Sequence, residues 1–91
     1  MLTVDVWEKV YWVPKDCKLV ILRLHGECRE VIIPDCGDLV YVVIKNETCH
    51  KVEIKVDNCG KCCIPLNCVE DKPCLFLKNH LGAWEKVCLA K

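Results

Sequence analysis

The sequence contains no serine and no glutamine, and its only threonines are Thr3 and Thr48. Without serine, hydrolysis by a serine nucleophile is excluded. Only four glycines are present, and they form no glycine-rich phosphate-binding loop. The longest apolar runs, residues 19–22 and 39–44, are far shorter than a transmembrane helix requires. We therefore expect no membrane span.

An excess of charge of either sign is also lacking, since thirteen basic residues balance thirteen acidic ones. Such a chain has no net field that would attract nucleic acid, so we expect no nucleic-acid partner. No nucleophile–base pair and no carboxylate dyad is recognisable, and we expect a protein that is not an enzyme. The scarcity of thermolabile residues beside abundant Lys and Glu favours a thermostable chain, as in hyperthermophiles.

Cysteine, in contrast, is abundant, with ten in 91 residues. A chain this short buries a limited core, and a cysteine content above about 8–10% indicates a disulfide scaffold. The even number permits five bridges, and the spacing leaves their pairing open. We expect Cys62 and Cys63 to bond to two different partners, because adjacent side chains of an extended chain point to opposite sides. The candidates for bridges are Cys17, Cys28, Cys36, Cys49, Cys59, Cys62, Cys63, Cys68, Cys74 and Cys88. Of these, we expect Cys17 and Cys28 to join neighbouring strands at opposite ends of the domain.

A zinc site is the alternative use of these thiols. Cys59 and Cys62 have the C-x₂-C spacing of half a zinc knuckle, in which two thiolates bind one ion. Cys68 and Cys74 would complete four thiolate ligands. One such site leaves six cysteines unexplained, so we expect no cofactor and keep zinc as the alternative.

Apolar and polar residues alternate with a period of two along most of the chain, which indicates β-strands. The pattern predicts strands over residues 2–13, 18–25, 29–33, 39–45, 49–56, 74–78 and 83–90. Residues 46–48 are expected to be a hairpin loop, where Asn46 fits the N-glycosylation motif at an accessible tip. Residues 57–73 show no period, and we expect an irregular, cysteine-rich loop there. The fold class predicted is all-β, a single domain over residues 1–91 that forms a small antiparallel β-sandwich or barrel of about seven short strands, stabilised by disulfides.

Trp7 and Tyr11 fall on the face of the first predicted strand that lies opposite its apolar row. Two aromatic side chains on that face need a covering surface, which is either a neighbouring loop or a subunit interface. We therefore take Trp7 and Tyr11 as interface candidates.

The first nine residues have no basic region, apolar core or cleavage site, so we expect no signal peptide, although the cysteine content calls for oxidation. We hypothesise a self-associating structural subunit of a virion, as a decoration or capsid protein, or of an extracellular filament or coat. Its expected location is the virion, the extracellular space or the cell surface, with the cytosol of a hyperthermophile as the other possibility. Two alternatives stay open: a secreted disulfide-rich binding module or inhibitor presenting residues 57–73, and a small zinc-binding intracellular adaptor.

Overall fold

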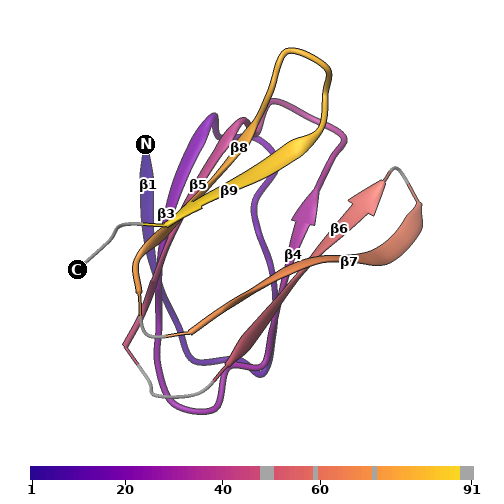
Figure 1. The fold of residues 1–91 in the computed structure, drawn as a ribbon. Helices are drawn as coiled ribbons and strands as arrows, with labels where there is room; N and C mark the ends of the chain where they lie inside the picture. The colour runs from indigo at the N-terminus through magenta and orange to yellow at the C-terminus, as the bar shows by residue number, and fades with distance from the viewer. Residues whose placement is uncertain (48–50, 59, 71, 89–91) are drawn as a thin grey trace.

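The computed structural model describes residues 1–47, 51–58, 60–70 and 72–88, which form nine strands in two sheets (Figure 1). Sheet A has the strand order β1-β3-β5-β8-β9, and sheet B has the order β2-β4-β6-β7. The strands are β1 (Leu2–Val6), β2 (Val10–Trp12), β3 (Leu19–Leu24), β4 (Glu30–Pro34), β5 (Tyr41–Asn46), β6 (Val52–Asn58), β7 (Lys61–Val69), β8 (Cys74–Lys78) and β9 (Trp84–Cys88). The predicted all-β fold with disulfides is confirmed.

From β1 to β6, the chain alternates between sheet A and sheet B. Leu2 lies opposite Val20 and Val20 opposite Val42, so successive strands of sheet A are offset by 18 and 22 residues and run parallel. Sheet B repeats this arrangement with β2, β4 and β6. We call β1 with β2 coil 1, β3 with β4 coil 2, and β5 with β6 coil 3. The antiparallel prediction was wrong for the pairings among these six strands, because the intervening strand in the opposite sheet serves as the crossover that parallel pairing requires.

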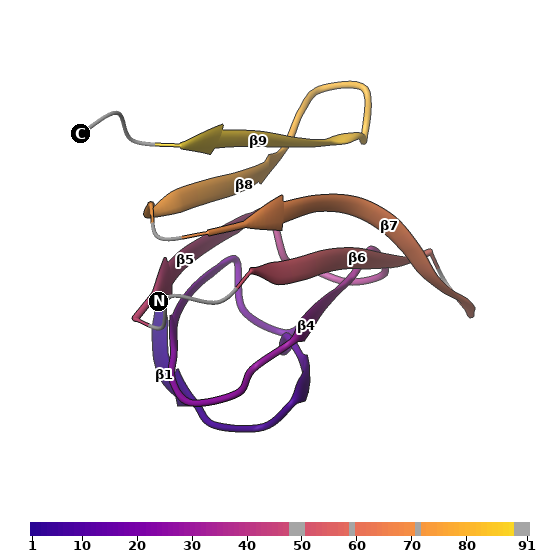
Figure 2. The same cartoon turned by 60° about the horizontal axis from the view of Figure 1, so that its bottom comes forward.

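The last three strands pair antiparallel and cover the end of coil 3. β7 pairs with β6, β8 with β5, and β9 with β8. Figure 2 shows β7, β8 and β9 on one side of the coils, with β1 on the other side. The irregular loop predicted over 57–73 was wrong where β7 forms, because two register shifts against β6 remove the period of two from its sequence.

The first predicted strand is divided in two at Glu8. An unbroken strand would place the Glu8 carboxylate in the row of Val4 and Val6, which faces the core. Burying an unpaired carboxylate is costly, and the chain instead bends at residues 7–9 and crosses to sheet B. Before this bend the even-numbered residues face the core, and after it the odd-numbered residues do, so Tyr11 and Val13 pack on the core.

The hairpin predicted around residues 46–48 does not form, because β5 and β6 belong to different sheets. Asn46 ends β5 with its side chain buried, and its Nδ2 lies 3.5 Å from the carbonyl oxygen of Val69. The expectation of an accessible glycosylation site was therefore wrong for Asn46 itself, while Thr48 lies outside the described residues.

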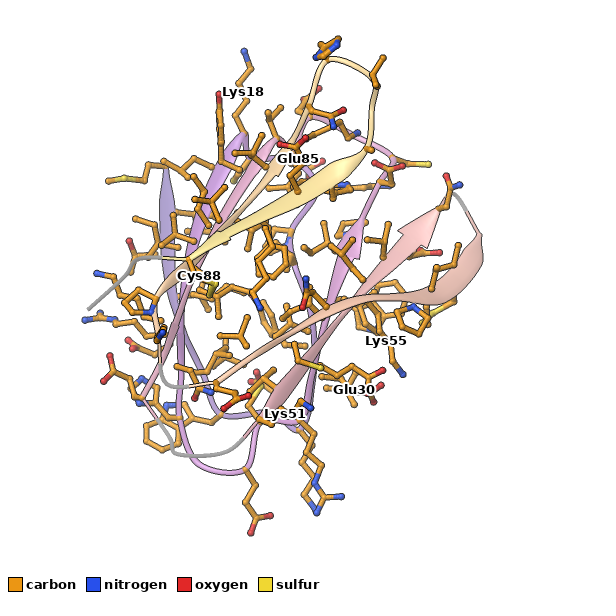
Figure 3. All side chains as sticks on the ribbon, in the orientation of Figure 1. Lys18, Glu30, Lys51, Lys55, Glu85 and Cys88 are labelled. Carbon is orange, nitrogen blue, oxygen red and sulfur yellow. A yellow bond between two sulfur atoms is a disulfide. The ribbon has the colours of Figure 1, made fainter. Side chains whose placement is uncertain are left out.

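Side chains from both sheets fill the space between them (Figure 3). The largest fully buried side chains include Phe76, Leu22, Ile33, Ile44 and Ile54, which come from strands of both layers. Each such side chain contributes on the order of 1.5–3 kcal/mol by its removal from water. No helix among the described residues is long and apolar enough to cross a membrane.

Candidate functional site

The edges of coil 1 form one end of both sheets, because β1 is the first strand of sheet A and β2 the first of sheet B. Val6 accepts a hydrogen bond from His25 of coil 2, and Lys9 accepts bonds from Arg29 and Glu30. The backbone groups of Val6 and Lys9 thus point toward coil 2. Since the N–H and C=O groups of successive strand residues point alternately to the two sides of a strand, the adjacent strand residues direct theirs away from coil 2. In the described part of the chain, no strand pairs with the outer side of β1 or β2. The residues with outward backbone groups are Thr3, Asp5, Val10 and Trp12. We call these four residues the open edge.

Exposed apolar side chains surround the open edge. Trp7 is 66% exposed, Trp12 48%, Val10 43% and Leu2 36%. The Trp7 ring stacks on the ring of His25, with centroids 4.5 Å apart and an interplanar angle of 17°. Large apolar side chains at this density on one end of a small domain are typical of an interaction surface.

A small ion cluster on the outer face of sheet A holds this end together. Asp5 Oδ1 lies 2.9 Å from His25 Nε2 and 3.1 Å from Arg23 Nε. The hydrogen bond with His25, followed by the charge of Arg23, keeps the pKa of Asp5 below its ordinary value, although partial desolvation opposes this. The cluster links coil 1 to coil 2 and places His25 under Trp7.

The opposite end of the molecule carries features that discourage strand pairing. Pro65 in β7 has no N–H group, and two register shifts disturb β7 against β6. Cys63 has a φ of 87°, a left-handed conformation outside the extended range. β9 presents the charged residues Glu85 and Lys86. Neither β1 nor β2 contains a proline, a lysine or a register shift.

Two disulfides are defined by both of their cysteines. Cys74 and Cys88 lie directly opposite in β8 and β9, with Cα atoms 4.0 Å apart, and their sulfurs are bonded. Cys62 bonds to its neighbour Cys63. The expectation that these two adjacent cysteines serve different partners was wrong, because the chain leaves the extended conformation at Cys63. Cys36 is also disulfide-bonded.

Cys17, Cys28 and Cys68 have free thiols, so the predicted framework of five bridges was wrong for these three residues. Cys28 lies two residues before β4 and Cys68 lies in β7, with β6 between these strands. Two strand spacings amount to about 9.5 Å, beyond the Cα separation that a disulfide allows. Cys49 and Cys59 lie outside the described residues.

The predicted zinc ligands are not brought together as thiolates. Cys62 and Cys74 are each in a disulfide, with Cys63 and Cys88 as their partners, so neither can bind a metal as a thiolate. Cys68 is a free thiol, and Cys59 lies outside the described residues. Across the described ranges, no group of three or more His, Cys, Asp or Glu side chains is arranged to hold a metal ion.

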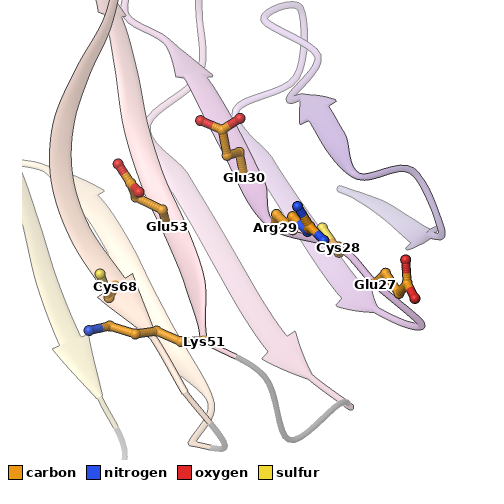
Figure 4. A pocket seen from close by; sticks show the side chains of 7 residues that line it. All are labelled: Glu27, Cys28, Arg29, Glu30, Lys51, Glu53 and Cys68. Atoms are coloured by element: carbon orange, nitrogen blue, oxygen red, sulfur yellow. The ribbon is translucent and has the colours of Figure 1, made fainter.

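A pocket of about 690 Å³ lies over the row of sheet B that contains Glu30, Glu53 and Cys68 (Figure 4). Both carboxylates pair with Lys55, and the hydrogen bond with Glu30 is the main reason that the pKa of Lys55 is raised. Cys28 also lines this pocket, and burial raises the pKa of its thiol to about 11, so it is not a thiolate near neutral pH. This pocket therefore holds a protonated Cys28 thiol beside two carboxylates that share one ammonium.

The two interface candidates, Trp7 and Tyr11, lie in different environments in the structure. Trp7 is exposed beside the open edge, as an interface residue requires. Tyr11 was misplaced, because the bend at Glu8 turns it inward, where it packs half-buried against the core and desolvation raises its pKa. Trp12 and Val10 take its place at the surface. The sequence signal for this exchange was Glu8, the one charged residue in the apolar row.

Comparisons of the chain with protein-family models, with curated proteins and with solved structures find no match.

Proposed function

We propose that this chain is a non-enzymatic structural subunit of a virion coat or an extracellular filament, and that it assembles with a second copy through the open edge. The observation that carries the proposal is the row of outward backbone groups at Thr3, Asp5, Val10 and Trp12, on strands without proline or register shifts. Unpaired strand edges bind other strands, and natural monomers protect them. Coil 1 lacks the protection that β7 has at the other end.

The two ends of the molecule differ, and this difference favours an end-to-end pair. A two-fold axis perpendicular to the sheets would place β1 beside the partner's β1 and β2 beside the partner's β2, antiparallel in both sheets. Each sheet would then extend across both copies of the pair. A head-to-tail stack would instead join the open edge to β7 and β9, where Pro65, register shifts and charges oppose pairing.

The exposed side chains add apolar area to such an interface. Leu2, Trp7 and Val10 lie at or beside the outer edge of coil 1, and all are more than one-third exposed. Tryptophan is enriched at the centres of protein interfaces because it buries a large surface with few rotatable bonds. The secreted-module alternative is less well supported, because residues 61–69 form a paired strand instead of a presented loop.

The test is a proline at the open edge. In Thr3→Pro, the outward N–H is lost while the bonds of Leu2 and Val4 to β3 are retained, so the fold is expected to persist. Thr3→Val keeps the N–H and is the matched control. By sedimentation velocity, we expect wild type and Thr3→Val to form pairs and Thr3→Pro to be monomeric.

A second pair of variants keeps the test decisive if Thr3→Pro does not fold. Val10 and Val87 are exposed to a similar degree, 43% and 52%, on edge strands at opposite ends. An edge lysine opposes strand pairing. We expect Val10→Lys to dissociate the pair and Val87→Lys to leave it intact. A monomeric wild type at high concentration, or equal behaviour of the two lysine variants, would contradict the proposal.

A further inference from the structure

A second pocket, of about 550 Å³, lies on the outer face of sheet B near the end of β6. The residues that line it include Trp12 of β2, Pro34 of β4, Asp57 of β6 and Lys15. Asp57 is directly opposite Pro34, and Trp12 is opposite Ile32, two residues before Pro34 on the same face. Pro34 thus forms the floor between an indole and a carboxylate.

One carboxylate oxygen of Asp57, Oδ1, lacks a hydrogen-bond partner in the described structure. This atom is buried and accepts no hydrogen bond from any described residue, although the backbone oxygen of Asp57 does accept one from Asp35. A buried carboxylate oxygen without a donor is strongly unfavourable, and native proteins nearly always satisfy such an atom by a protein group, a water or a ligand. Lys15 lines the pocket without pairing to Asp57.

The other wall suits a positively charged ligand. The Trp12 side chain is 48% exposed and available for contact. Strands β2 and β6 are two strand spacings apart, about 9.5 Å, which leaves room for one flat or compact group between indole and carboxylate. Tryptophan is the aromatic side chain that attracts cations most strongly, and its attraction adds to that of the carboxylate.

We infer that this pocket binds an organic cation, a protonated amine or a guanidinium, with its charge at Asp57 and its alkyl chain against Trp12 and Pro34. The inference goes beyond the proposed assembly and does not depend on it, because the cation would be held on the face of sheet B by Asp57 and the Trp12 indole, whereas strand pairing uses the outward backbone groups of β2.

The test is an NMR titration of the folded chain with Nα-acetyl-lysine N-methylamide and Nα-acetyl-arginine N-methylamide. The uncharged Nα-acetyl-norleucine N-methylamide is the control ligand. We expect the cationic probes to shift the indole signal of Trp12 and the norleucine probe to leave it unchanged. A greater affinity for the arginine probe would indicate a guanidinium ligand, and the reverse an ammonium ligand.

Variants separate a specific site from general charge attraction. Asp57→Asn should weaken binding by about tenfold or more, the change that corresponds to one lost charge-assisted contact. Asp16→Asn removes an equal charge from an exposed residue that does not line the pocket, and should change the affinity by less than about twofold. Lys15→Met should strengthen binding, since it removes a competing cation.

The inference would be overturned if neither cationic probe shifts the Trp12 signal, or if norleucine binds as well as lysine. These two results need only the wild-type chain, so they hold even if a variant fails to fold. Equal binding by wild type and Asp57→Asn would also overturn it. The sedimentation behaviour of Asp57→Asn should match that of wild type, which keeps this test distinct from that of the assembly.

Discussion

Replacing Asp35 by alanine should loosen the contact between the coils and the covering strands. Asp35 follows β4 in sheet B, yet its Oδ1 accepts a hydrogen bond from Trp84 Nε1 at 3.0 Å, from the start of β9 in sheet A. The same oxygen pairs with Lys78 Nζ at 2.8 Å, and that ammonium lies 5.7 Å from the Trp84 ring centroid. One carboxylate therefore links the two layers through two partners.

The magnitude follows from the burial of the partners. Trp84 is only 8% exposed, so its indole N–H would be left buried without an acceptor, and a hydrogen bond to a charged group contributes about 1.5–3 kcal/mol. The Asp35 and Lys78 side chains are 21% and 24% exposed, and an ion pair screened by water contributes only about 0.2–1 kcal/mol. We expect Asp35→Ala to lower the free energy of unfolding by about 2–3 kcal/mol. Asp35→Asn keeps an oxygen acceptor and should lose about 1 kcal/mol.

Urea unfolding followed by tryptophan fluorescence measures both variants. A double-mutant cycle with Lys78→Met isolates the ion pair and should give a coupling of about 0.2–1 kcal/mol. If Asp35→Ala lowers the free energy of unfolding by less than about 0.5 kcal/mol, the Asp35 carboxylate does not stabilise the contact between the layers, and the prediction is refuted.

Two further predictions concern the cysteines. Replacing both Cys74 and Cys88 by alanine opens a loop with a sequence separation of 14 residues. The free energy of unfolding, measured in urea, should fall by about 2–4 kcal/mol. An unchanged midpoint of urea unfolding would contradict this. The pKa of Cys28 is raised from 9.0 to about 11 in the folded state, so the thiol of the unfolded chain ionises at lower pH than that of the folded chain. The contribution of Cys28 to the free energy of unfolding is therefore complete below pH 9 and is lost as the pH rises through 11. Cys28→Val should therefore lose less stability than wild type between pH 8 and 11, and identical losses in the two proteins would show that the thiol is not held protonated.

Strand positions were largely predictable from the alternating pattern, whereas strand partners were not. The period of two shows which residues face a core, and the strands at 18–25, 29–33 and 74–78 were placed within one or two residues. Pairing direction depends on where the chain returns after each strand, which is a long-range property. The parallel coils therefore left no local signal, and offsets of 18 and 22 residues are too unequal to appear as a sequence repeat.

Two particular residues account for much of the remaining difference. Glu8 marked the division of the first strand, because a carboxylate in an apolar row forces the chain out of the core. Cys63 adopts a left-handed backbone, which no pattern of side chains would reveal, and this allows a bond to Cys62. Trp7 could be predicted as an exposed aromatic, but Trp12 could not, since its exposure depends on the phase change after Glu8.

The most direct test of the assembly is amide hydrogen exchange at the open edge as a function of protein concentration. The amides of Thr3, Asp5, Val10 and Trp12 point away from coil 2, so they are protected only when a second copy pairs with them. We predict that their exchange slows as the concentration rises, while the amides of β9 exchange at a constant rate. Fast exchange of these four amides at every concentration, with a monomeric mass throughout, would contradict the account.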